Sequence, residues 1–206
     1  MERIVYVVDD DDHVRAALVD LLGSAGYTAH GFASANQFFS STLPAIASCL
    51  ILDMKMPGSN GFDVVRMLEQ KGVVIPVIFL SGYGTIPITV QAMKAGAREF
   101  FTKPVHSDQL LLAVEQALSY AEHNLASSTE HAASTQRLGT LTPREREVLE
   151  LAIGGLLNKQ IATELGISEI TAKVHKRRVM DKMEARTLAD LVRAAERLQI
   201  SRARSR

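Results

Sequence analysis

Three short apolar runs in the first half of the chain end directly on charged residues. The runs, each with the residue that follows it, are 4–8 before Asp9, 49–52 before Asp53, and 100–102 before Lys103. Their length and composition are typical of buried strands. Because parallel strands place their C-terminal ends along one edge of a sheet, we expect the three charged side chains to meet in one crevice. The pattern predicts an α/β fold whose sheet edge carries the chemistry.

Helical patterns lie between the apolar runs and favour a doubly wound sheet. The expected strands cover residues 4–8, 28–32, 49–52, 73–80 and 98–102, and the expected helices cover 14–22, 37–41, 62–70, 87–95 and 107–123, with 57–61 as a loop. Regular alternation of strands and helices implies a parallel sheet with helices on both faces. We therefore predict a five-stranded, flavodoxin-like domain over residues 1–123.

Charge is divided unevenly between the two halves of the chain. Of the 206 residues, 1–125 hold 8 Lys and Arg against 13 Asp and Glu, whereas 126–206 hold 15 against 10. The formal net charge of zero therefore conceals an acidic first half and a basic second half. Such asymmetry is expected when an acidic regulatory domain is joined to a domain that binds a polyanion.

A polar segment separates the two predicted domains. Residues 124–137 are rich in Ala, Ser and Thr and lose the apolar periodicity, so we predict a linker there. Leu118, Ala121 and Leu125 keep a helical spacing, which would let the preceding helix continue into this linker. Only helical patterns follow, and they assign residues 138–206 to an all-α domain.

The last residues carry alternating arginines. Arg202, Arg204 and Arg206 form a short basic tail. We expect this tail to be a disordered, solvated end, with contact to phosphate as the alternative.

The cysteine content and the hydropathy of the sequence indicate where in the cell the protein is found. The single cysteine, Cys49, lies in an apolar run, where we expect it to fill the core rather than to catalyse. One thiol cannot form an intrachain disulfide, which favours a reducing compartment. No apolar run approaches the ~20 residues of a membrane-spanning helix, and no secretion signal precedes the first strand. The sequence predicts a cytoplasmic protein without a membrane partner.

Four consecutive aspartates follow the first apolar run. Such a run is by itself as consistent with a solvated charge cluster as with a site. Asp11 and Asp12 are expected to face solvent or to begin a helix, where carboxylates favour the positive N-terminal end. Asp9 and Asp10 would repel Asp53 unless a cation lay among them. Mg²⁺ suits such a site because it binds one or two carboxylates together with waters and phosphate oxygens.

Three further groups are expected at the same edge. The backbone carbonyl of Lys55, two residues after Asp53, can supply another oxygen to the cation. Ser81 follows an apolar run, so its hydroxyl can hydrogen-bond a phosphoryl oxygen. Lys103 contributes an ammonium group. Together these groups predict a site for a phosphoryl group and for Mg²⁺, with Mn²⁺ or another divalent cation as alternatives.

The first half resembles the receiver domain of two-component response regulators. The matching segments are Val7-Val8-Asp9-Asp10, Asp53-Met54-Lys55-Met56-Pro57, Leu80-Ser81-Gly82, Met93-Lys94-Ala95-Gly96-Ala97 and Lys103-Pro104. The resemblance extends from the first expected strand to the fifth expected helix. It implies that Asp53 accepts a phosphoryl group from a phosphohistidine of a sensor histidine kinase.

The same resemblance implies roles for the residues around Asp53. The implied cation ligands are Asp10, Asp53 and the Lys55 backbone carbonyl. Asp9 would lie next to these ligands without contacting the cation itself. Lys103 would contact a phosphoryl oxygen. Ser81 and Phe100 would change position when Asp53 is phosphorylated.

Capping signals in the second half predict a helix-turn-helix. The expected N-caps are Thr142, Asn158 and Ser168, and the expected helix breaks are the Gly154-Gly155 pair and Gly166. Glu145, three residues after Thr142, completes a capping box. Two helices joined by a short turn that contains glycine are typical of a helix-turn-helix, with the third helix running to about residue 183.

The third of these helices has two different faces. At 100° per residue, Ala172, Val179 and Met183 form a buried stripe. The opposite side holds Ile170, Val174 and Arg177, flanked by Lys173 and Arg178. Cations beside an exposed valine suit a helix in the DNA major groove, where Arg or Lys meets guanine or phosphate and an apolar side chain meets a thymine methyl. A charged face that only contacts solvent is the alternative.

The second half is similar to the LuxR/NarL-type DNA-binding domain. The matching segments are Leu141-Thr142-Pro143-Arg144-Glu145-Arg146-Glu147-Val148-Leu149, Asn158-Lys159-Gln160-Ile161-Ala162 and Lys173-Val174-His175. With the helix faces above, the expected DNA-binding residues are Lys173, Val174, His175, Lys176, Arg177 and Arg178. His175 would lie beside the phosphate backbone or, as the alternative, be buried and hydrogen-bonded. The two resemblances together imply the FixJ/NarL-type architecture, with a four-helix output domain.

The leading hypothesis is a transcription factor controlled by phosphorylation. Phosphorylated receivers would pair through the fourth helix and fifth strand, and the homodimer would bind a double-stranded DNA operator, with RNA polymerase as a further partner. A signalling adaptor that binds a protein is one alternative, which the basic charge of the second half disfavours. The other is a hydrolase with Asp53 as nucleophile. Lys55 stands where such phosphatases have a second Asp, so we assign no catalytic residues and expect no external substrate.

Overall fold

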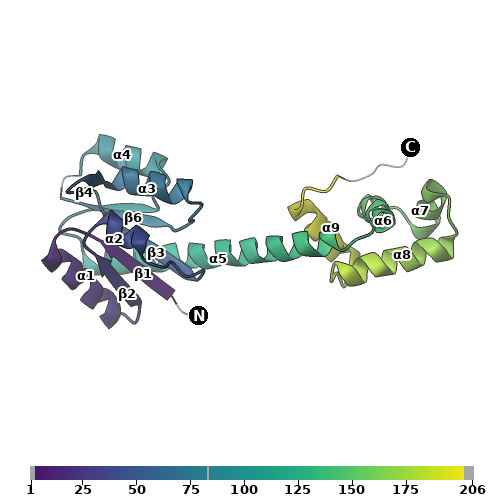
Figure 1. Cartoon of the computed structure of the whole chain (residues 1–206), viewed down its shortest axis with the longest axis horizontal. Coiled ribbons are helices and arrows are strands. Elements are labelled where there is room, and N and C mark those ends of the chain that lie inside the picture. Colours follow the sequence, from purple (N-terminus) through teal and green to yellow (C-terminus); the bar gives the residue numbers. More distant parts are fainter. Residues whose placement is uncertain (1–2, 83, 202–206) are drawn as a thin grey trace. The chain divides into compact units, whose positions relative to one another are not determined.

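The computed structural model describes residues 3–82 and 84–201, and the chain divides into two compact units (Figure 1). The units are Met1–Ala126 and Ser127–Arg206. The tail arginines Arg202, Arg204 and Arg206 lie outside the described residues. Within the residues that are described, no helix combines the length and hydrophobicity needed to cross a membrane.

The first unit is built on one parallel sheet. Its strands are β1 (Arg3–Val8), β2 (Thr28–Phe32), β3 (Ala47–Asp53), β6 (Val77–Ser81) and β7 (Glu99–Thr102), in the order β2-β1-β3-β6-β7. Its helices are α1 (Asp12–Ser24), α2 (Ala35–Ser40), α3 (Gly61–Gln70), α4 (Ile86–Lys94) and the first part of α5 (Ser107–Gly139). The fold class expected from the sequence is therefore confirmed.

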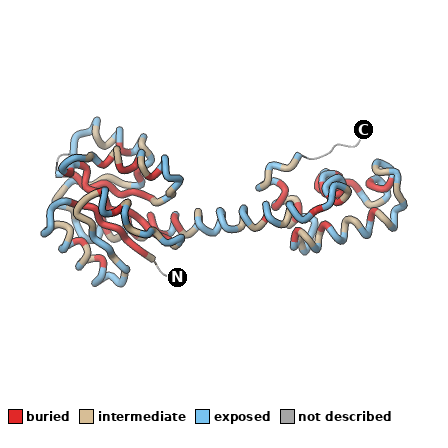
Figure 2. The backbone as a smooth tube through the Cα atoms, in the orientation of Figure 1, coloured by how far each residue is buried: buried red, intermediate tan, exposed pale blue. Residues whose placement is uncertain are grey.

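The sheet is covered on both faces. Ile4, Tyr6 and Val8 of β1 belong to a core shared with α2, α3 and α4, whereas Val5 and Val7 belong to a second core shared with α1 and α5. This split follows from the period of two in a strand, which sends successive side chains to opposite faces. The buried strands appear as the red interior of this unit in Figure 2. Helices on both faces leave the strand ends free to form a site.

Cys49 lies in the middle of β3 and is fully buried. Burial raises the pKa of its thiol to about 12. The thiol is thus protonated at neutral pH and fills space in the core, as the sequence predicted.

Two element boundaries differ from the sequence prediction. The strand predicted for 73–80 begins only at Val77, because Pro76 has no amide hydrogen to give to the ladder and Val74 is exposed. The loop predicted for 57–61 contains part of a small antiparallel hairpin, β4 (Lys55–Met56) and β5 (Ser59–Asn60). This hairpin begins two residues after Asp53, close to the end of β3.

Helix α5 runs past the predicted end at residue 123, and the segment proposed as a linker, 124–137, is helical. In the first unit, the Arg3 guanidinium of β1 donates to Glu115 at 2.8 Å and to Glu122 at 2.9 Å. These ion pairs join the helix to the edge of the sheet opposite the strand C-termini.

The second unit consists of the end of α5 and four further described helices. These are α6 (Pro143–Ile153), α7 (Asn158–Leu165), α8 (Glu169–Lys182) and α9 (Leu188–Arg197). Ser134 near the end of α5 is buried, and Arg137 pairs with Glu184 at 2.6 Å. One apolar core joins α6, α7, α8 and α9.

The caps of the second unit agree with the sequence at two positions and differ at one. Thr142 and Ser168 cap α6 and α8 through their side chains. The expected cap Asn158 is wrong, since it is the first residue inside α7 and Leu157 is the N-cap. The Gln160 side chain reaches back to accept from the Leu157 amide at 2.8 Å, so a residue inside α7 pairs the amide of the cap residue.

Candidate functional site

Four strand ends of the first unit meet along one edge of the sheet. Asp9 follows β1, Asp53 ends β3, Ser81 ends β6 and Lys103 follows β7. These strands are consecutive neighbours in the sheet. Their parallel register pairs Asp53 with Leu80 and Ser81 with Thr102. Residues far apart in the sequence are therefore brought to the same edge.

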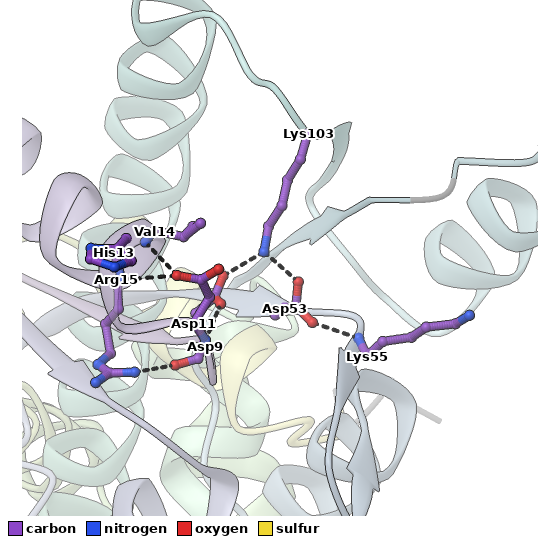
Figure 3. A network of polar contacts seen from close by, with 8 residues as sticks. All are labelled: Asp9, Asp11, His13, Val14, Arg15, Asp53, Lys55 and Lys103. Carbon is purple, nitrogen blue, oxygen red and sulfur yellow. Dashed lines mark hydrogen bonds and ion pairs between the residues drawn. The ribbon is translucent and has the colours of Figure 1, made fainter.

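Lys103 connects the two buried carboxylates of this edge (Figure 3). Its Nζ donates to Asp9 Oδ2 and to Asp53 Oδ1, each at 2.6 Å. The Asp9 side chain is 2% exposed and the Asp53 side chain 7% exposed. Two nearly buried acids thus share one ammonium group, and this trio is called the acidic pocket below.

Backbone donors hold the remaining oxygens of the acidic pocket. The Lys55 amide donates to Asp53 Oδ2 at 2.7 Å, and the Asp11 amide donates to Asp9 Oδ1 at 3.0 Å. Arg15 Nη1 donates to the Asp9 carbonyl at 2.6 Å. Both carboxylates are therefore fixed in orientation. The role of Arg15 was not predicted, because a contact from the second turn of α1 depends on the path of the preceding loop.

Two further aspartates of the acidic run begin α1. Asp11 caps α1, accepting from the amides of His13 at 2.8 Å and Val14 at 3.1 Å. Asp12 is in the first turn of α1 and pairs with Arg15. Asp10 is exposed in the loop between β1 and α1. The run thus divides into two helix-starting residues and two residues at the strand end, as the sequence predicted for Asp11 and Asp12.

Burial and charge shift the pKa values of the acidic pocket. Burial raises the pKa of the Asp53 carboxyl, against the lowering effect of Lys103, and the nearby Asp9 raises it further. Burial lowers the pKa of Lys103, but the hydrogen bonds from its ammonium to Asp53 and Asp9 outweigh this and leave it raised. Lys103 therefore stays charged, and one positive charge faces two carboxylates.

The oxygens at this edge suit a hard divalent cation. Among the described residues, no group of three or more His, Cys, Asp or Glu side chains is placed to hold a metal ion. An ion here would need backbone, water or phosphate oxygens besides carboxylates, which is the coordination that Mg²⁺ accepts. Asp53, the exposed Asp10 and the Lys55 carbonyl carry such oxygens, and two carboxylates facing one ammonium group leave an excess of negative charge that favours a cation. The residues present fit Mg²⁺.

Ser81 and Phe100 flank the acidic pocket on β6 and β7. Ser81 is buried, and its carbonyl accepts from the Lys103 amide at 2.8 Å. Phe100 is half-buried against the core and pairs in register with Phe79. Phe100 also lines a cavity of about 510 Å³ beside α4, together with Ile86 and Val90. Phe100 therefore shares a cavity with side chains of α4 and with Thr102 at the end of β7.

Helix α8 of the second unit exposes a basic face. Lys173, Arg177 and Arg178 are exposed, as is Val174, while Lys176 is half-buried. Ala172, Val179 and Met183 are buried on the other side. The two faces are those that the helical spacing predicted. The basic face of α8 is the name used below for the exposed residues of positions 170–178.

The hydrogen-bonded alternative for His175 has no support at Nδ1. This residue is half-buried, and its Nδ1 is buried without a hydrogen-bond partner among the described residues. Asn158 Oδ1 is in the same situation. The buried and hydrogen-bonded role considered for His175 is therefore not seen at this nitrogen.

A buried ion pair fixes α8 against α6. Glu145 is buried and accepts from Lys182 Nζ at 2.7 Å and from the Thr142 amide at 2.9 Å. The hydrogen bond from Lys182, followed by that from Thr142, lowers the pKa of Glu145 below its usual range. The sequence predicted Glu145 as part of a capping box, but no sequence pattern identified Lys182 as its partner.

Comparison with known proteins assigns a family to each half of the chain. Residues 5–115 match the response regulator receiver domain, and residues 139–195 match the bacterial regulatory proteins of the luxR family. The chain belongs to the two-component response regulators of the FixJ/NarL family. Response regulators of this family are transcription regulators, in which phosphorylation of the receiver by a sensor histidine kinase promotes dimerisation and DNA binding.

Individual response regulators are similar over nearly the whole chain. Nodulation protein W of Bradyrhizobium diazoefficiens is 43% identical over 97% of this chain and 88% of its own length. The response regulator protein TodT of Pseudomonas putida is 42% identical over 96% of this chain and 87% of its own length. A solved structure of the response regulator StyR has a TM-score of 0.85 and 43% identity, covering 95% of this chain and 99% of that one. Receiver domains generally bind Mg²⁺ at an acidic pocket.

Proposed function

We propose that Asp53 is the residue that a sensor histidine kinase phosphorylates, and that the basic face of α8 is the surface that then binds operator DNA. The observation that carries the first part is the pair of 2.6 Å hydrogen bonds from Lys103 Nζ to Asp9 and Asp53. A buried carboxylate with an ammonium beside it can receive a phosphoryl group whose new charge is matched at once. Asp53 lies at the sheet edge where ligands of such folds bind.

Phosphoryl transfer changes the contacts of Asp53. One carboxylate oxygen attacks the phosphorus of the kinase phosphohistidine, so that a P–O bond forms while the P–N bond breaks. The histidine leaves as neutral imidazole, because its other ring nitrogen already carries a proton. Both Asp53 oxygens already accept a hydrogen bond, from Lys103 and from the Lys55 amide. The transfer therefore displaces one donor, and Lys103 can follow the charge onto a phosphoryl oxygen. Ser81, which ends the neighbouring strand, can donate its hydroxyl to another.

Mg²⁺ would be held by Asp10, Asp53 and the Lys55 carbonyl, with Asp9 behind them; Mn²⁺ or another divalent cation can take the same oxygens. When bound, the ion neutralises the charge that builds up on the phosphoryl oxygens during transfer. Asp9 keeps Lys103 in place from the buried side of the acidic pocket.

The surface of α4 and β7 is the proposed homodimer interface of the phosphorylated form. Ile86 is 83% exposed, and Val90 and Met93 on the same helix are also exposed. Phe100 lines the cavity between α4 and β7, so movement of its ring would alter this surface. Apolar side chains that gather on one exposed face are typical of protein contacts.

The dimer would bring two α8 helices to half-sites about one turn of DNA apart. The proposed DNA contacts are Lys173, Val174, His175, Lys176, Arg177 and Arg178. RNA polymerase is a further proposed partner, since the family regulates transcription. We place the protein in the cytoplasm because its proposed DNA partner is there. We propose no external substrate, since Lys55 stands two residues after Asp53 where a hydrolase would need a second acid.

The direct test is phosphorylation of the full chain by acetyl phosphate in Mg²⁺, followed by intact mass. We expect one phosphoryl group on the wild type, none on Asp53→Asn, and loss of the adduct with EDTA. Asp20→Asn, which changes an exposed carboxylate of α1, is the matched control and should be phosphorylated like the wild type. Equal phosphorylation of Asp53→Asn and the wild type would refute the assignment.

The second part of the test is DNA selection from random oligonucleotides with and without acetyl phosphate. Phosphorylation should enrich one sequence and should increase the dimer fraction in sedimentation. If neither DNA affinity nor dimerisation changed, Asp53 would not control the second unit.

A further inference from the structure

Ile170 is the most exposed large apolar residue of α8. It is 78% exposed, against 43% for Val174 one turn later. Ile167, three residues before it, packs against the core of the second unit, whereas Ile170 is not part of that core. A β-branched side chain is also a moderate helix former, so helix stability does not account for it. Neither packing nor propensity explains an isoleucine here.

Ile170 shares a face with residues proposed to contact DNA. At 100° per residue, positions 170, 174 and 177 lie within about 60° of one another around the helix. Ile170 and Val174 therefore form an apolar strip one turn long, with Arg177 at its end. Lys173 lies beside the strip. The strip is at the N-terminal end of α8, the part of a recognition helix that contacts base edges.

The backbone under Ile170 is held firmly. The Thr171 amide donates to Ser168 Oγ at 3.1 Å, and the two side-chain hydroxyls are 2.8 Å apart. Ala172 is completely buried on the other side of the same turn. Ile170 is thus exposed on a fixed element rather than on a loose end, so little conformational entropy is lost when it makes a contact.

The positive charge around the apolar strip indicates which kind of partner binds there. Helix α8 contains Lys173, Lys176, Arg177, Arg178 and Lys182 against Glu169 and Asp181. A polyanion that also presents methyl groups matches such a surface, and double-stranded DNA does so through the C5-methyl of thymine in the major groove.

We propose that Ile170 is a specificity-determining residue that contacts a thymine methyl group, beside a second contact from Val174. The proposal rests on the proposed docking of α8 in the major groove. Four residues of helix advance about 6 Å, and stacked base pairs are about 3.4 Å apart. The two methyl contacts should therefore lie about two base-pair steps from each other in each half-site.

The test replaces each thymine of the selected operator by deoxyuridine, one at a time. This change removes only the C5-methyl group. Affinities of the full phosphorylated chain are measured by fluorescence anisotropy for the wild type, Ile170→Ala, Val174→Ala and the control Leu188→Ala, which alters a partly exposed leucine of α9. For the wild type we expect a loss of about fourfold at each contacted thymine, the value for one buried methyl group.

Ile170→Ala should become insensitive to deoxyuridine at one position and stay sensitive at the position that Val174 contacts. Leu188→Ala should behave as the wild type. Should Ile170→Ala bind too weakly to measure, Ile170→Val keeps a shorter side chain and should show a reduced loss at the same position.

The inference is overturned if Ile170→Ala retains the wild-type loss at every thymine, or if the wild type is insensitive throughout. Failure of the docking itself gives a different result, because Arg177→Ala would then bind the operator as the wild type does.

Discussion

Charged groups are buried and closely paired in the acidic pocket, but exposed and loosely paired on the basic face of α8. In the acidic pocket, Lys103 is 2.6 Å from two nearly buried carboxylates. On the basic face, Arg177 is exposed and only loosely paired, with Asp181 at 3.9 Å. Buried pairs interact strongly and change only when a new charge enters, whereas exposed cations remain available to a polyanion. The first region suits a switch, and the second suits recognition without rearrangement.

The largest effect is expected from removal of Lys103, the half-buried cation that bridges two nearly buried carboxylates. Lys103→Met leaves Asp9 and Asp53 facing each other without compensation, which should lower the free energy of unfolding by about 2–4 kcal/mol. Mg²⁺ should restore more stability to this variant than to the wild type, because it replaces the missing positive charge. Urea unfolding with and without Mg²⁺ measures both effects.

The control for Lys103 is Lys94→Met, which removes an exposed cation at the end of α4. Its stability should stay within about 0.5 kcal/mol of the wild type. If Lys103→Met were as stable as Lys94→Met in buffer free of Mg²⁺, the closely paired Lys103 would stabilise the fold no more than an exposed lysine does.

On the exposed side, Arg177→Ala should weaken operator binding by about 1–3 kcal/mol, the range of one base-specific contact. Lys176→Ala should instead weaken binding to all sequences alike and reduce the slope of log affinity against log salt by about one. Salt titrations with operator and random DNA separate the two effects. Equal losses on both DNA sequences for Arg177→Ala would show that it contacts only phosphate.

A smaller effect is expected at Glu145, where a buried pair supports the exposed face. Glu145→Gln should cost about 1–2 kcal/mol of unfolding free energy at pH 7, since it weakens the bonds from Lys182 and Thr142. Because the folded pKa of Glu145 is lowered, its contribution is present above the ordinary pKa of about 4.3 and is lost as the pH falls through the folded value. The variant should therefore approach the wild type in strongly acidic buffer.

Chemical unfolding at several pH values tests this expectation. Glu150→Gln changes an exposed glutamate of the same helix and serves as the control. A gap between Glu145→Gln and the wild type that stayed constant down to pH 3 would show that its charge does not stabilise the fold.

The sequence predicted those features that depend on local pattern. Strand ends at Asp9, Asp53 and Lys103 followed from apolar runs, and the two faces of α8 followed from helical spacing. The start of β6 at Val77 was missed because an apolar run does not show which residues pair, although Pro76 was a signal against the longer strand.

One long-range side-chain pairing and two local features of the second half of the chain were not predicted. The pairing of Lys182 with Glu145 joins residues 37 positions apart, and no periodicity relates them. The helical state of 124–137 was left open, because Ala, Ser and Thr do not determine a conformation by themselves. The N-cap at Leu157 was missed because the capping bond comes from the Gln160 side chain rather than from the cap residue.

Cys49 can report the opening of β3, because its thiol is unreactive while the strand is in place. Its thiol is fully buried in β3, and burial raises its pKa to about 12, so a thiol reagent should not modify the native chain. Modification requires β3 to open, and β3 is the strand that ends at Asp53. The rate of labelling thus measures how often the strand that carries the proposed phosphorylation site separates from its neighbours. A cysteine introduced on an exposed position of α8 could be labelled without interference from it.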